Sequence, residues 1–352
     1  MRTNRTTTVL QMVCIVLFLC SSSSGIEISV LNYNVNGIGA AGTDSREALQ
    51  RIVDYFDPDI IIFQEAKGTT YPDDFLSVNS DYEGYYSSAD GAYNRRMVMS
   101  KYDIIDSSVR EHPLGEGSLR TLFAVTIDLP GAKDLEVFMA HWHASDPTIR
   151  DNESAASVLI ISQYRAAHPN SLYIYGGDLN DEDTSYRVTD LLDPNVGLNL
   201  ITPVDLNNGS NATINSDPNT GTYLSRRIDY ILPSDRVVSF VTGGRVLNTW
   251  TYTAETIPPG LTLTDTIDAS DHLPIFMCFE LPELGDMDGD HLVNFVDMAL
   301  FAGHWQETGC GECGGADLTG DGNVDLNDVR ELANNWLECY LASPQTCSAW
   351  VR

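Results

Sequence analysis

Polar residues that could hold a metal ion or transfer a proton recur where short apolar runs of the sequence end. Asn34, Glu65 and His141 each close such a run. Carboxylate and amide oxygens are the ligands that Mg²⁺ prefers, and histidine is the side chain most often used as an acid or base. Together these residue types could bind a cation, orient water and contact a phosphate, which phosphoester hydrolysis requires. The full set of candidates is Asn34, Glu65, His141, Asp178, Asn180, Asp229, Asp271 and His272.

The segments that carry these residues alternate between predicted strands and helices. Apolar residues recur from Leu49 at i, i+3, i+4 and i+7, so residues 44–56 are expected to form an amphipathic helix with Asp44 as its N-cap. Residues 151–167 are also expected to be helical, and residues 203–221, rich in Asn, Ser, Gly and Pro, to form a long loop. Because most of the candidates lie at strand ends, one open edge of the sheets could gather them. The predicted strands are 26–34 and 134–141, together with two short apolar runs, 59–65 and 171–178, that are expected to be buried strands.

The order of these motifs resembles that of the endonuclease/exonuclease/phosphatase superfamily, the deoxyribonuclease-I-like metal-dependent phosphoesterases. The resemblance covers roughly residues 27–281 and is carried by Gln64–Glu65, "GDLN" at 177–180, "RIDYIL" at 227–232 and "SDHLPI" at 270–275. It implies an α+β fold of four layers, α/β/β/α, in which two β-sheets pack face to face with helices outside.

The resemblance also implies a magnesium or manganese site and an activated water molecule. Glu65 would be the leading metal ligand, with Asn34 and Asp271 beside it, directly or through water. Asp178 would orient or deprotonate the attacking water, and Asn180 would hold that water or the phosphate. Magnesium often takes only one or two carboxylates and keeps several waters, so a sparse set of protein ligands is expected.

Two histidines would act on the phosphate in this resemblance. His272 would contact the phosphate, with Asp229 fixing the imidazole ring through its other nitrogen. His141 would be a phosphate ligand or a general acid, and the nearby His143 is the alternative for this role.

The strand expected in "AYNRRMVMSKYDI" departs from the secreted deoxyribonucleases, which carry there a glutamate that pairs with the first histidine. This chain has two arginines in that segment instead. They could contact the substrate phosphate, with further arginines beside them, or they could form surface ion pairs in an acidic protein. The arginines concerned are Arg95 and Arg96, with Arg120, Arg226 or Arg227 as further candidates.

After Pro282 the sequence repeats at an offset of 31 residues, as in the pairs Asp286/Asp317 and Trp305/Trp336. In each copy, oxygen-bearing side chains fall at positions 1, 3, 5, 9 and 12 of a loop, and a predicted helix follows. A backbone carbonyl at position 7 would complete the oxygen shell that Ca²⁺ prefers. The predicted ligands are Asp286, Asp288, Asp290, Leu292, Asn294 and Asp297 in the first loop, and Asp317, Thr319, Asp321, Asn323, Asp325 and Asp328 in the second.

This duplicated pattern resembles the type I dockerin module, a small all-α calcium-binding domain whose members bind cohesin domains on other proteins. Two features depart from that family. His291 occupies position 6 of the first loop, where glycine usually makes the turn. Phe295–Val296 and Leu326–Asn327 occupy positions 10 and 11, in place of the small hydroxyl pair of cellulosomal dockerins. The alternative is a calcium-stabilised cap without a partner.

The ends of the chain carry processing and redox signals. Two arginines, an apolar run and "SSSSG" predict a signal peptide at 1–25, with an uncleaved membrane anchor as the alternative. Cys278 is expected to be a buried thiol. Four cysteines near the C-terminus predict two disulfides, a stronger interpretation than zinc binding; they are Cys310, Cys313, Cys339 and Cys347. The predicted parts are a signal peptide at 1–25, a phosphoesterase domain at 26–282, a dockerin-like domain at 285–338 and a tail at 339–352.

The chain is strongly acidic, with 50 Asp and Glu residues against 20 Lys and Arg. Such a surface repels nucleic acid at long range, so binding to a polyanion must be local or assisted by metal. The motifs favour a secreted phosphoesterase that a cohesin partner could hold at a cell surface. An extracellular nuclease is favoured over a phosphatase or phospholipase that acts on a small or lipid phosphate ester. A non-catalytic scaffold with an inactive phosphoesterase fold is the alternative from another class.

Overall fold

The computed structural model describes residues 25–88, 95–217, 222–223, 226–288, 292–310 and 313–336. The chain forms two compact units, with a division between Phe279 and Glu280. In the part of the chain described, no helix is long and apolar enough to cross a membrane. The predicted signal peptide, apart from Gly25, and the tail at 339–352 lie outside the described residues.

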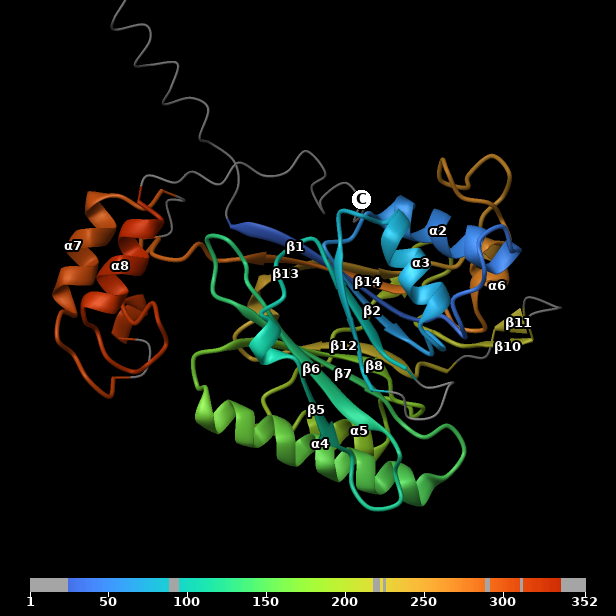
Figure 1. Cartoon of the computed structure of the whole chain (residues 1–352), viewed down its shortest axis with the longest axis horizontal. Helices are drawn as coiled ribbons and strands as arrows, with labels where there is room; N and C mark the ends of the chain where they lie inside the picture. The colour runs from blue at the N-terminus through green and yellow to red at the C-terminus, as the bar shows by residue number, and fades with distance from the viewer. Residues whose placement is uncertain are drawn as a thin grey trace, which may run out of the picture. The chain divides into compact units, whose positions relative to one another are not determined.

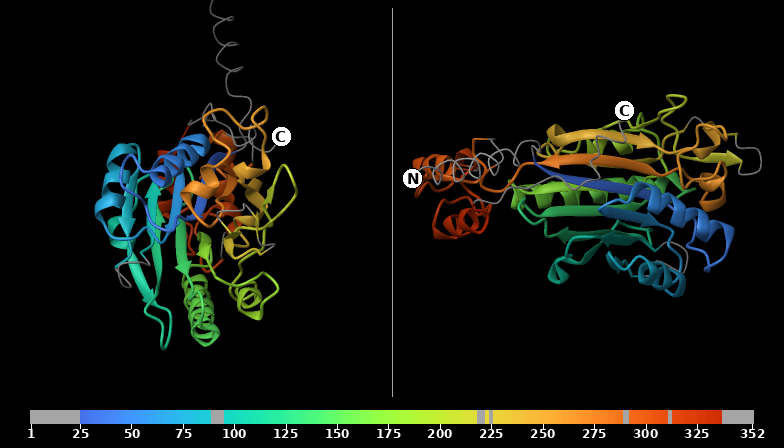
Figure 2. Two further views of the ribbon diagram at one scale, coloured as in Figure 1. Left: turned by 90° about the vertical axis from the view of Figure 1, so that its right-hand side faces the viewer. Right: turned by 90° about the horizontal axis from the view of Figure 1, so that it is seen from above.

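The larger unit contains two β-sheets that face each other between layers of helices (Figure 1, Figure 2). One sheet has seven strands in the order β3-β4-β2-β1-β14-β13-β9, the other has five in the order β12-β8-β7-β6-β5, and β10 and β11 form a separate pair. The strands are β1 Ile26–Asn34, β2 Ile60–Gln64, β3 Glu83–Tyr86, β4 Met97–Ser100, β5 Arg110–Pro113, β6 Thr121–Ile127, β7 Leu135–His141, β8 Leu172–Asp178, β9 Val204–Asp205, β10 Asn215–Asp217, β11 Thr222–Tyr223, β12 Asp229–Pro233, β13 Val241–Val246 and β14 Ile275–Leu281.

Helices cover the outer face of each sheet. The first group lies over the seven-stranded sheet and the second over the five-stranded sheet (Figure 1). The first group is α2 Asp44–Phe56, α3 Thr70–Val78 and α6 Asp265–Ala269, and the second is α4 Pro147–Ala167 and α5 Tyr186–Leu191. Short 3₁₀ helices are η1 Asp106–Ser108, η2 Val238–Phe240, η3 Thr249–Thr251 and η4 Cys313–Gly315.

The strand and helix periods explain this layering. Successive strand side chains point to opposite faces, so Leu31 and Tyr33 of β1 pack with Leu49 and Ile52 of α2. In the other sheet, Tyr175 of β8 lies in a second core that α4 closes. Strands β1, β2, β7 and β8 are buried almost throughout because both of their faces are covered. The predicted α+β arrangement of two packed sheets with outer helices is confirmed.

Three local predictions were wrong in detail. The N-cap of α2 is Thr43, whose side chain accepts a hydrogen bond from the backbone N–H of Arg46, and not Asp44. Helix α4 begins at Pro147, before the predicted start, because Asp146 caps it and proline suits a first helical position. The predicted loop at 203–221 contains β9 and β10. Strands this short give too little periodicity to predict.

The smaller unit contains helices α7 Phe295–Gly303 and α8 Leu326–Asn334, which confirms the two predicted helices. Each begins with a capping box, in which the N-cap and the third helical residue bind each other's backbone N–H. Its core residues are Val293, Phe301, Cys313, Ala316, Leu318, Val324 and Leu332.

The cysteines pair in part as predicted. Cys310 and Cys313 form a disulfide, and the predicted cysteine partners Cys339 and Cys347 lie outside the described residues. Cys278 is buried but disulfide-bonded, so its interpretation as a free thiol was wrong. A cysteine inside an apolar strand gives no sequence signal that separates the two states.

Candidate active site

The pairing of strands brings the predicted catalytic residues to one edge of the two sheets. β1 and β2 run parallel, and Asn34 at the end of β1 pairs with Gln64, so Glu65, the next residue, lies close to Asn34. β7 and β8 are also parallel, and their last residues, His141 and Asp178, are partners. β12 is antiparallel to β8, which sets its first residue, Asp229, opposite Asp178.

Asp178 lies at the centre of the site and is only 1% exposed. Its Oδ2 accepts hydrogen bonds from Nδ2 of Asn34 at 3.0 Å and from Nδ2 of Asn180 at 3.1 Å. The same oxygen lies 3.5 Å from Nε2 of His141 and 3.7 Å from Nε2 of His272. One carboxylate oxygen therefore faces four of the residues that the sequence selects.

Gly177 permits the close approach of β7 and β8 beside this carboxylate. Its φ is +146°, and a Cβ atom at this position would lie 1.9 Å from the backbone oxygen of Ala140. Only glycine fits this conformation and this spacing. The glycine before Asp178 therefore positions the central carboxylate.

Glu65 and Asp178 place two carboxylates around one amide group. Nδ2 of Asn34 lies 3.3 Å from Oε1 of Glu65 and 3.0 Å from Oδ2 of Asp178. Carboxylates this close repel each other, and hard oxygen donors suit Mg²⁺, so the residues fit a divalent cation. Oδ1 of Asn34 accepts the backbone N–H of Asn36 at 3.1 Å, so Asn34 would reach that cation through water or after its amide rotates.

Ser270, a residue that the sequence analysis did not select, connects Asp271 with Asn34. The Ser270 hydroxyl donates to the backbone oxygen of Asn34 at 2.6 Å and lies 3.4 Å from Oδ1 of Asp271. Its position before Asp271 in "SDHLPI" was the available signal.

His272 and Asp229 form a buried ion pair, with Nδ1 of the ring 2.9 Å from Oδ2 of the carboxylate. Burial lowers the pKa of His272, but the charges of Asp229 and Asp178 outweigh it and raise the pKa to about 10. Burial has the opposite effect on the carboxyl group of Asp178: it raises the pKa of Asp178, although the positive charge of His272 lowers it. These three residues offer ligand atoms within 4.8 Å of one another. Because Asp229 already engages the ring, His272 suits a charged contact to an anion better than a metal bond.

His141 is buried beside the same carboxylates but has the opposite electrostatic character. Burial, followed by the charges of Arg120 and Arg96, holds the pKa of His141 well below its usual range. Its ring is therefore neutral at pH 7 and suits a hydrogen bond to phosphate rather than general acid catalysis. The Nδ1 atom of the alternative residue, His143, accepts the backbone N–H of Asp146 at 2.9 Å, at the start of α4.

Two of the predicted phosphate-binding arginines have protein partners near His141. Arg96 is fully buried and donates to Oγ1 of Thr121 at 2.6 Å, with Glu111 at 4.0 Å. Arg120 donates to the backbone oxygen of His141 at 2.9 Å. Both therefore hold the protein around this histidine, and their contact with a substrate phosphate stays a prediction.

The remaining arginines lie among surface and loop partners. The Arg95 guanidinium is 6.0 Å from the centre of the Tyr86 ring. Arg226 forms an ion pair with Glu182 at 2.8 Å, as the alternative interpretation expected for such residues. Arg227 is only 3% exposed, so its side chain lies buried beside a loop and not on an open surface.

The predicted calcium loops bring several carboxylates together. Asp286, Asp288 and Asp297 each offer one oxygen, all within 4.8 Å of one another. In the second loop, Oδ1 of Asp328 accepts the backbone N–H of Thr319 at 2.9 Å. Asp290, the fifth position of the first loop, and the adjacent His291 lie outside the described residues. The other predicted positions are Leu292, Asn294, Asp317, Asp321, Asn323 and Asp325.

Two residues at position 9 already act as helix caps. Oδ1 of Asn294 accepts the backbone N–H of Val296 at 2.7 Å, and Oδ1 of Asp325 accepts that of Asn327 at 2.7 Å. In EF-hand loops position 9 often binds calcium through water, which is compatible with capping.

Comparisons with known proteins agree with the two-sheet architecture. A model of the endonuclease/exonuclease/phosphatase family matches residues 31–272. No match was found among curated protein sequences.

Three solved structures illustrate the shared fold. Truncated TDP2 of Caenorhabditis elegans is 20% identical, covering 72% of this chain and 98% of its own, with a TM-score of 0.53. A mannosyl-6-phosphatase of Bacteroides thetaiotaomicron is 19% identical, covering 71% and 98%, with a TM-score of 0.54. A 3′ phosphatase from Neisseria, bound to a product DNA hairpin, is 18% identical, covering 72% and 99%, with a TM-score of 0.53. At this identity they support the fold alone.

Proposed function

We propose that this chain, which belongs to the endonuclease/exonuclease/phosphatase family of metal-dependent phosphoric ester hydrolases, is a secreted phosphodiesterase. Its proposed substrate is extracellular nucleic acid. The strongest support for a phosphodiesterase site is the convergence on Oδ2 of Asp178, where two amides donate and two imidazoles approach within 3.7 Å.

The proposed mechanism assigns one task to each group. Asp178 orients the attacking water and accepts its proton, because burial brings its pKa closer to neutral pH. Asn180 holds the water or a phosphoryl oxygen. His272, kept protonated by Asp229, contacts the phosphoryl oxygens and can protonate the leaving oxygen. His141, whose ring is neutral, donates a hydrogen bond to the phosphate. A divalent cation held by Glu65, with Asn34 and Asp271 beside it, would neutralise charge on the phosphate.

Two substrate classes remain distinct candidates. A nucleic acid fits the family and is the favoured substrate. The observation that supports the alternative, a small or lipid phosphate ester, is the charge of the chain, −30, because an acidic surface weakens long-range attraction to a polyanion. Among proteins of similar fold, one is a 3′ phosphatase bound to a DNA product and another a mannosyl-6-phosphatase.

A substrate panel with Mg²⁺, Mn²⁺ or chelator separates these candidates. It contains plasmid DNA, single-stranded RNA, phospholipid, inositol phosphates and bis(p-nitrophenyl) phosphate. We expect metal-dependent cleavage of nucleic acid, lost in Asp178→Ala and His272→Ala but kept in the exposed matched controls Asp54→Ala and His168→Ala. Cleavage confined to lipid or small esters would replace the nuclease proposal. Absence of all hydrolysis would leave the non-catalytic scaffold.

For the smaller unit we propose calcium binding and docking to a cohesin-type partner. The carboxylates grouped in the first loop and the capping boxes that close both loops support calcium binding. Positions 10 and 11 support an apolar contact with a partner, because Phe295, Val296 and Leu326 are 79%, 51% and 74% exposed. Such a partner would hold the secreted enzyme at a cell surface.

A cohesin pull-down with calcium and with chelator tests this second proposal. We expect calcium-dependent capture that Phe295→Ser weakens. Calcium-dependent thermal stabilisation without capture would leave a calcium-stabilised cap. If calcium changes neither stability nor capture, the calcium proposal fails as well.

A further inference from the structure

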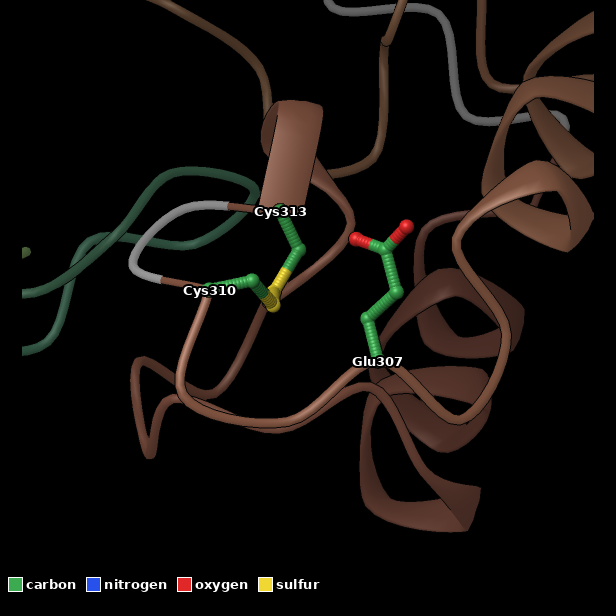
Figure 3. Close-up of side chains that lie close together, drawn as sticks. All are labelled: Glu307, Cys310 and Cys313. Carbon is green, nitrogen blue, oxygen red and sulfur yellow. A yellow bond between two sulfur atoms is a disulfide. The ribbon is translucent and has the colours of Figure 1, made fainter.

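The segment between the two predicted calcium loops brings together four side chains that the catalytic and calcium sites do not use. His304, Glu307, Cys310 and Cys313 follow one another at intervals of three residues. One atom each of Glu307, Cys310 and Cys313 lies within 4.8 Å of the others. Nδ1 of His304 lies 3.1 Å from Oε2 of Glu307. Figure 3 shows the Glu307 carboxylate pointing toward the Cys310–Cys313 disulfide.

The backbone around these residues is fixed in ways that keep them together. Helix α7 ends at Gly303, so His304 and Glu307 occupy the turn that follows, where the N–H of Glu307 donates to the backbone oxygen of His304 at 3.0 Å. A Cβ atom at Gly314, which follows Cys313 and has φ +64°, would lie 2.5 Å from Nε2 of His304. The absence of a side chain at Gly314 therefore lets the imidazole lie against the cysteine turn.

In the disulfide form, two of the four groups cannot bind a metal. Reduction by two molecules of a low-molecular-weight thiol transfers two electrons to the sulfur–sulfur bond, yields two cysteine thiols and releases the oxidised thiol as its disulfide. Binding of a divalent cation to both sulfurs then releases the two thiol protons to solvent. The opened pair would supply two thiolates beside an imidazole and a carboxylate.

We propose that the reduced form of this cluster is a Zn²⁺ site with His304, Glu307, Cys310 and Cys313 as its ligands. Tetrahedral zinc has Zn–N and Zn–O distances of about 2.0–2.1 Å, which places two such ligand atoms roughly 3.3 Å apart. The 3.1 Å separation of His304 Nδ1 and Glu307 Oε2 is close to that spacing. Two thiolates, one imidazole and one carboxylate form a donor set that zinc prefers over the hard cation calcium.

Because of where this cluster lies, replacement of the disulfide by bound zinc would matter for the neighbouring predicted calcium loop. The N–H of Gly309, beside Cys310, donates to the backbone oxygen of Gly322 at 2.7 Å, within the second predicted calcium loop. Zinc in the reduced form would keep the cysteine turn closed next to this loop, as the disulfide does in the oxidised form. The smaller unit would then keep its fold in both redox conditions.

Cobalt substitution tests the proposal on the full chain. The protein is saturated with Ca²⁺ to fill the carboxylate loops, reduced with a phosphine without oxygen, and titrated with Co²⁺. We expect one equivalent of Co²⁺ with thiolate-to-cobalt charge-transfer absorption and the visible bands of tetrahedral cobalt. Zn²⁺ should abolish these bands, and oxidised protein should not develop them. Reduced protein without a thiolate band would overturn the proposal.

Variants test the four ligands separately. Cys310→Ser and Cys313→Ser should each weaken the charge-transfer band, because one thiolate remains, and the double variant should lose it, while Cys278→Ser, the matched cysteine control, should keep it. His304→Ala and Glu307→Gln should each weaken Co²⁺ binding at least about 10-fold, since even outer-sphere partners of metal ligands contribute that much. Far-ultraviolet circular dichroism confirms that each variant is folded. If His304→Ala and Glu307→Gln both bind Co²⁺ with unchanged affinity, the four-ligand assignment is overturned. His304 and Glu307 would then be a surface ion pair beside a structural disulfide.

Discussion

Replacing Asp229 with Asn removes the charge that keeps His272 protonated while it preserves the size of the side chain. Asp229 is fully buried, and its Oδ2 lies 2.9 Å from the ring nitrogen. The pKa of His272 is raised from 6.5 to about 10, a difference that corresponds to about 5 kcal/mol in favour of the charged ring. An opposite charge at contact distance accounts for roughly 1–3 pH units. The variant keeps Asp178, which lies 3.7 Å from the ring in the wild type, so the pKa of His272 should fall by roughly 1–3 units and not return fully to its ordinary value.

The assay is the dependence of kcat on pH between about 6 and 10, measured with saturating Mg²⁺. A raised pKa means that the His272 ring keeps its proton until the pH rises through about 10, so the wild-type rate should fall at the alkaline end. It should also fall at the acidic end, where Asp178, whose pKa is raised to about 7, takes up a proton and can no longer act as the base. In Asp229→Asn the alkaline limb should move down by roughly 1–3 pH units, and the two enzymes should differ least at low pH. Asp54→Asn, an exposed change on α2, is the matched control and should leave the profile unchanged. An alkaline limb that stays with the wild type in Asp229→Asn would refute the role of charged His272.

Three further predictions concern the metal, the backbone and calcium. Glu65→Gln should raise the Mg²⁺ concentration for half-maximal activity at least about 10-fold, measured by metal titration at constant substrate; an unchanged requirement would place the metal elsewhere. Gly177→Ala should lower the free energy of unfolding by about 3 kcal/mol, because its Cβ would collide with backbone. In the control Gly303→Ala, an added Cβ would meet nothing within 4 Å, so the free energy of unfolding should change by no more than about 1 kcal/mol. Urea denaturation compares the two variants, and equal stability would contradict the close approach of β7 and β8. Calcium at 100 times its Kd should stabilise the smaller unit by about 2.7 kcal/mol per loop, and Asp328→Ala should remove the share of the second loop in calorimetry; a variant with the full calcium response would exclude Asp328 as a ligand.

Strand ends were predictable from the sequence because apolar runs are short and their polar ends are distinct. The ends of β1, β2, β7 and β8 agree with the predicted runs within a residue. Parallel pairing then follows from the alternation of strands and helices, and it sets Asn34 beside Glu65 and His141 beside Asp178.

The contacts of the site were less predictable because they depend on register and packing between distant segments. Asp229 begins β12 rather than ending it, and only antiparallel pairing places it opposite Asp178. The opposite electrostatic states of His141 and His272 depend on which charges lie nearest to each buried ring. The bond that orients the Asn34 amide likewise has no separate signal in the sequence. The place of Ser270 before Asp271 indicates that it is near the site, but not that it binds the backbone of Asn34.

The most direct test of the account is phosphodiester hydrolysis by Asp178→Asn, measured under single-turnover conditions with saturating Mg²⁺. Asparagine keeps the size of the side chain but cannot accept a proton from water, so the chemical step should slow by roughly 10²–10⁴-fold while the protein stays folded. If the variant binds substrate and cleaves it at the wild-type rate, Asp178 is not the group that activates water, and the site proposed at this edge of the sheets is wrong.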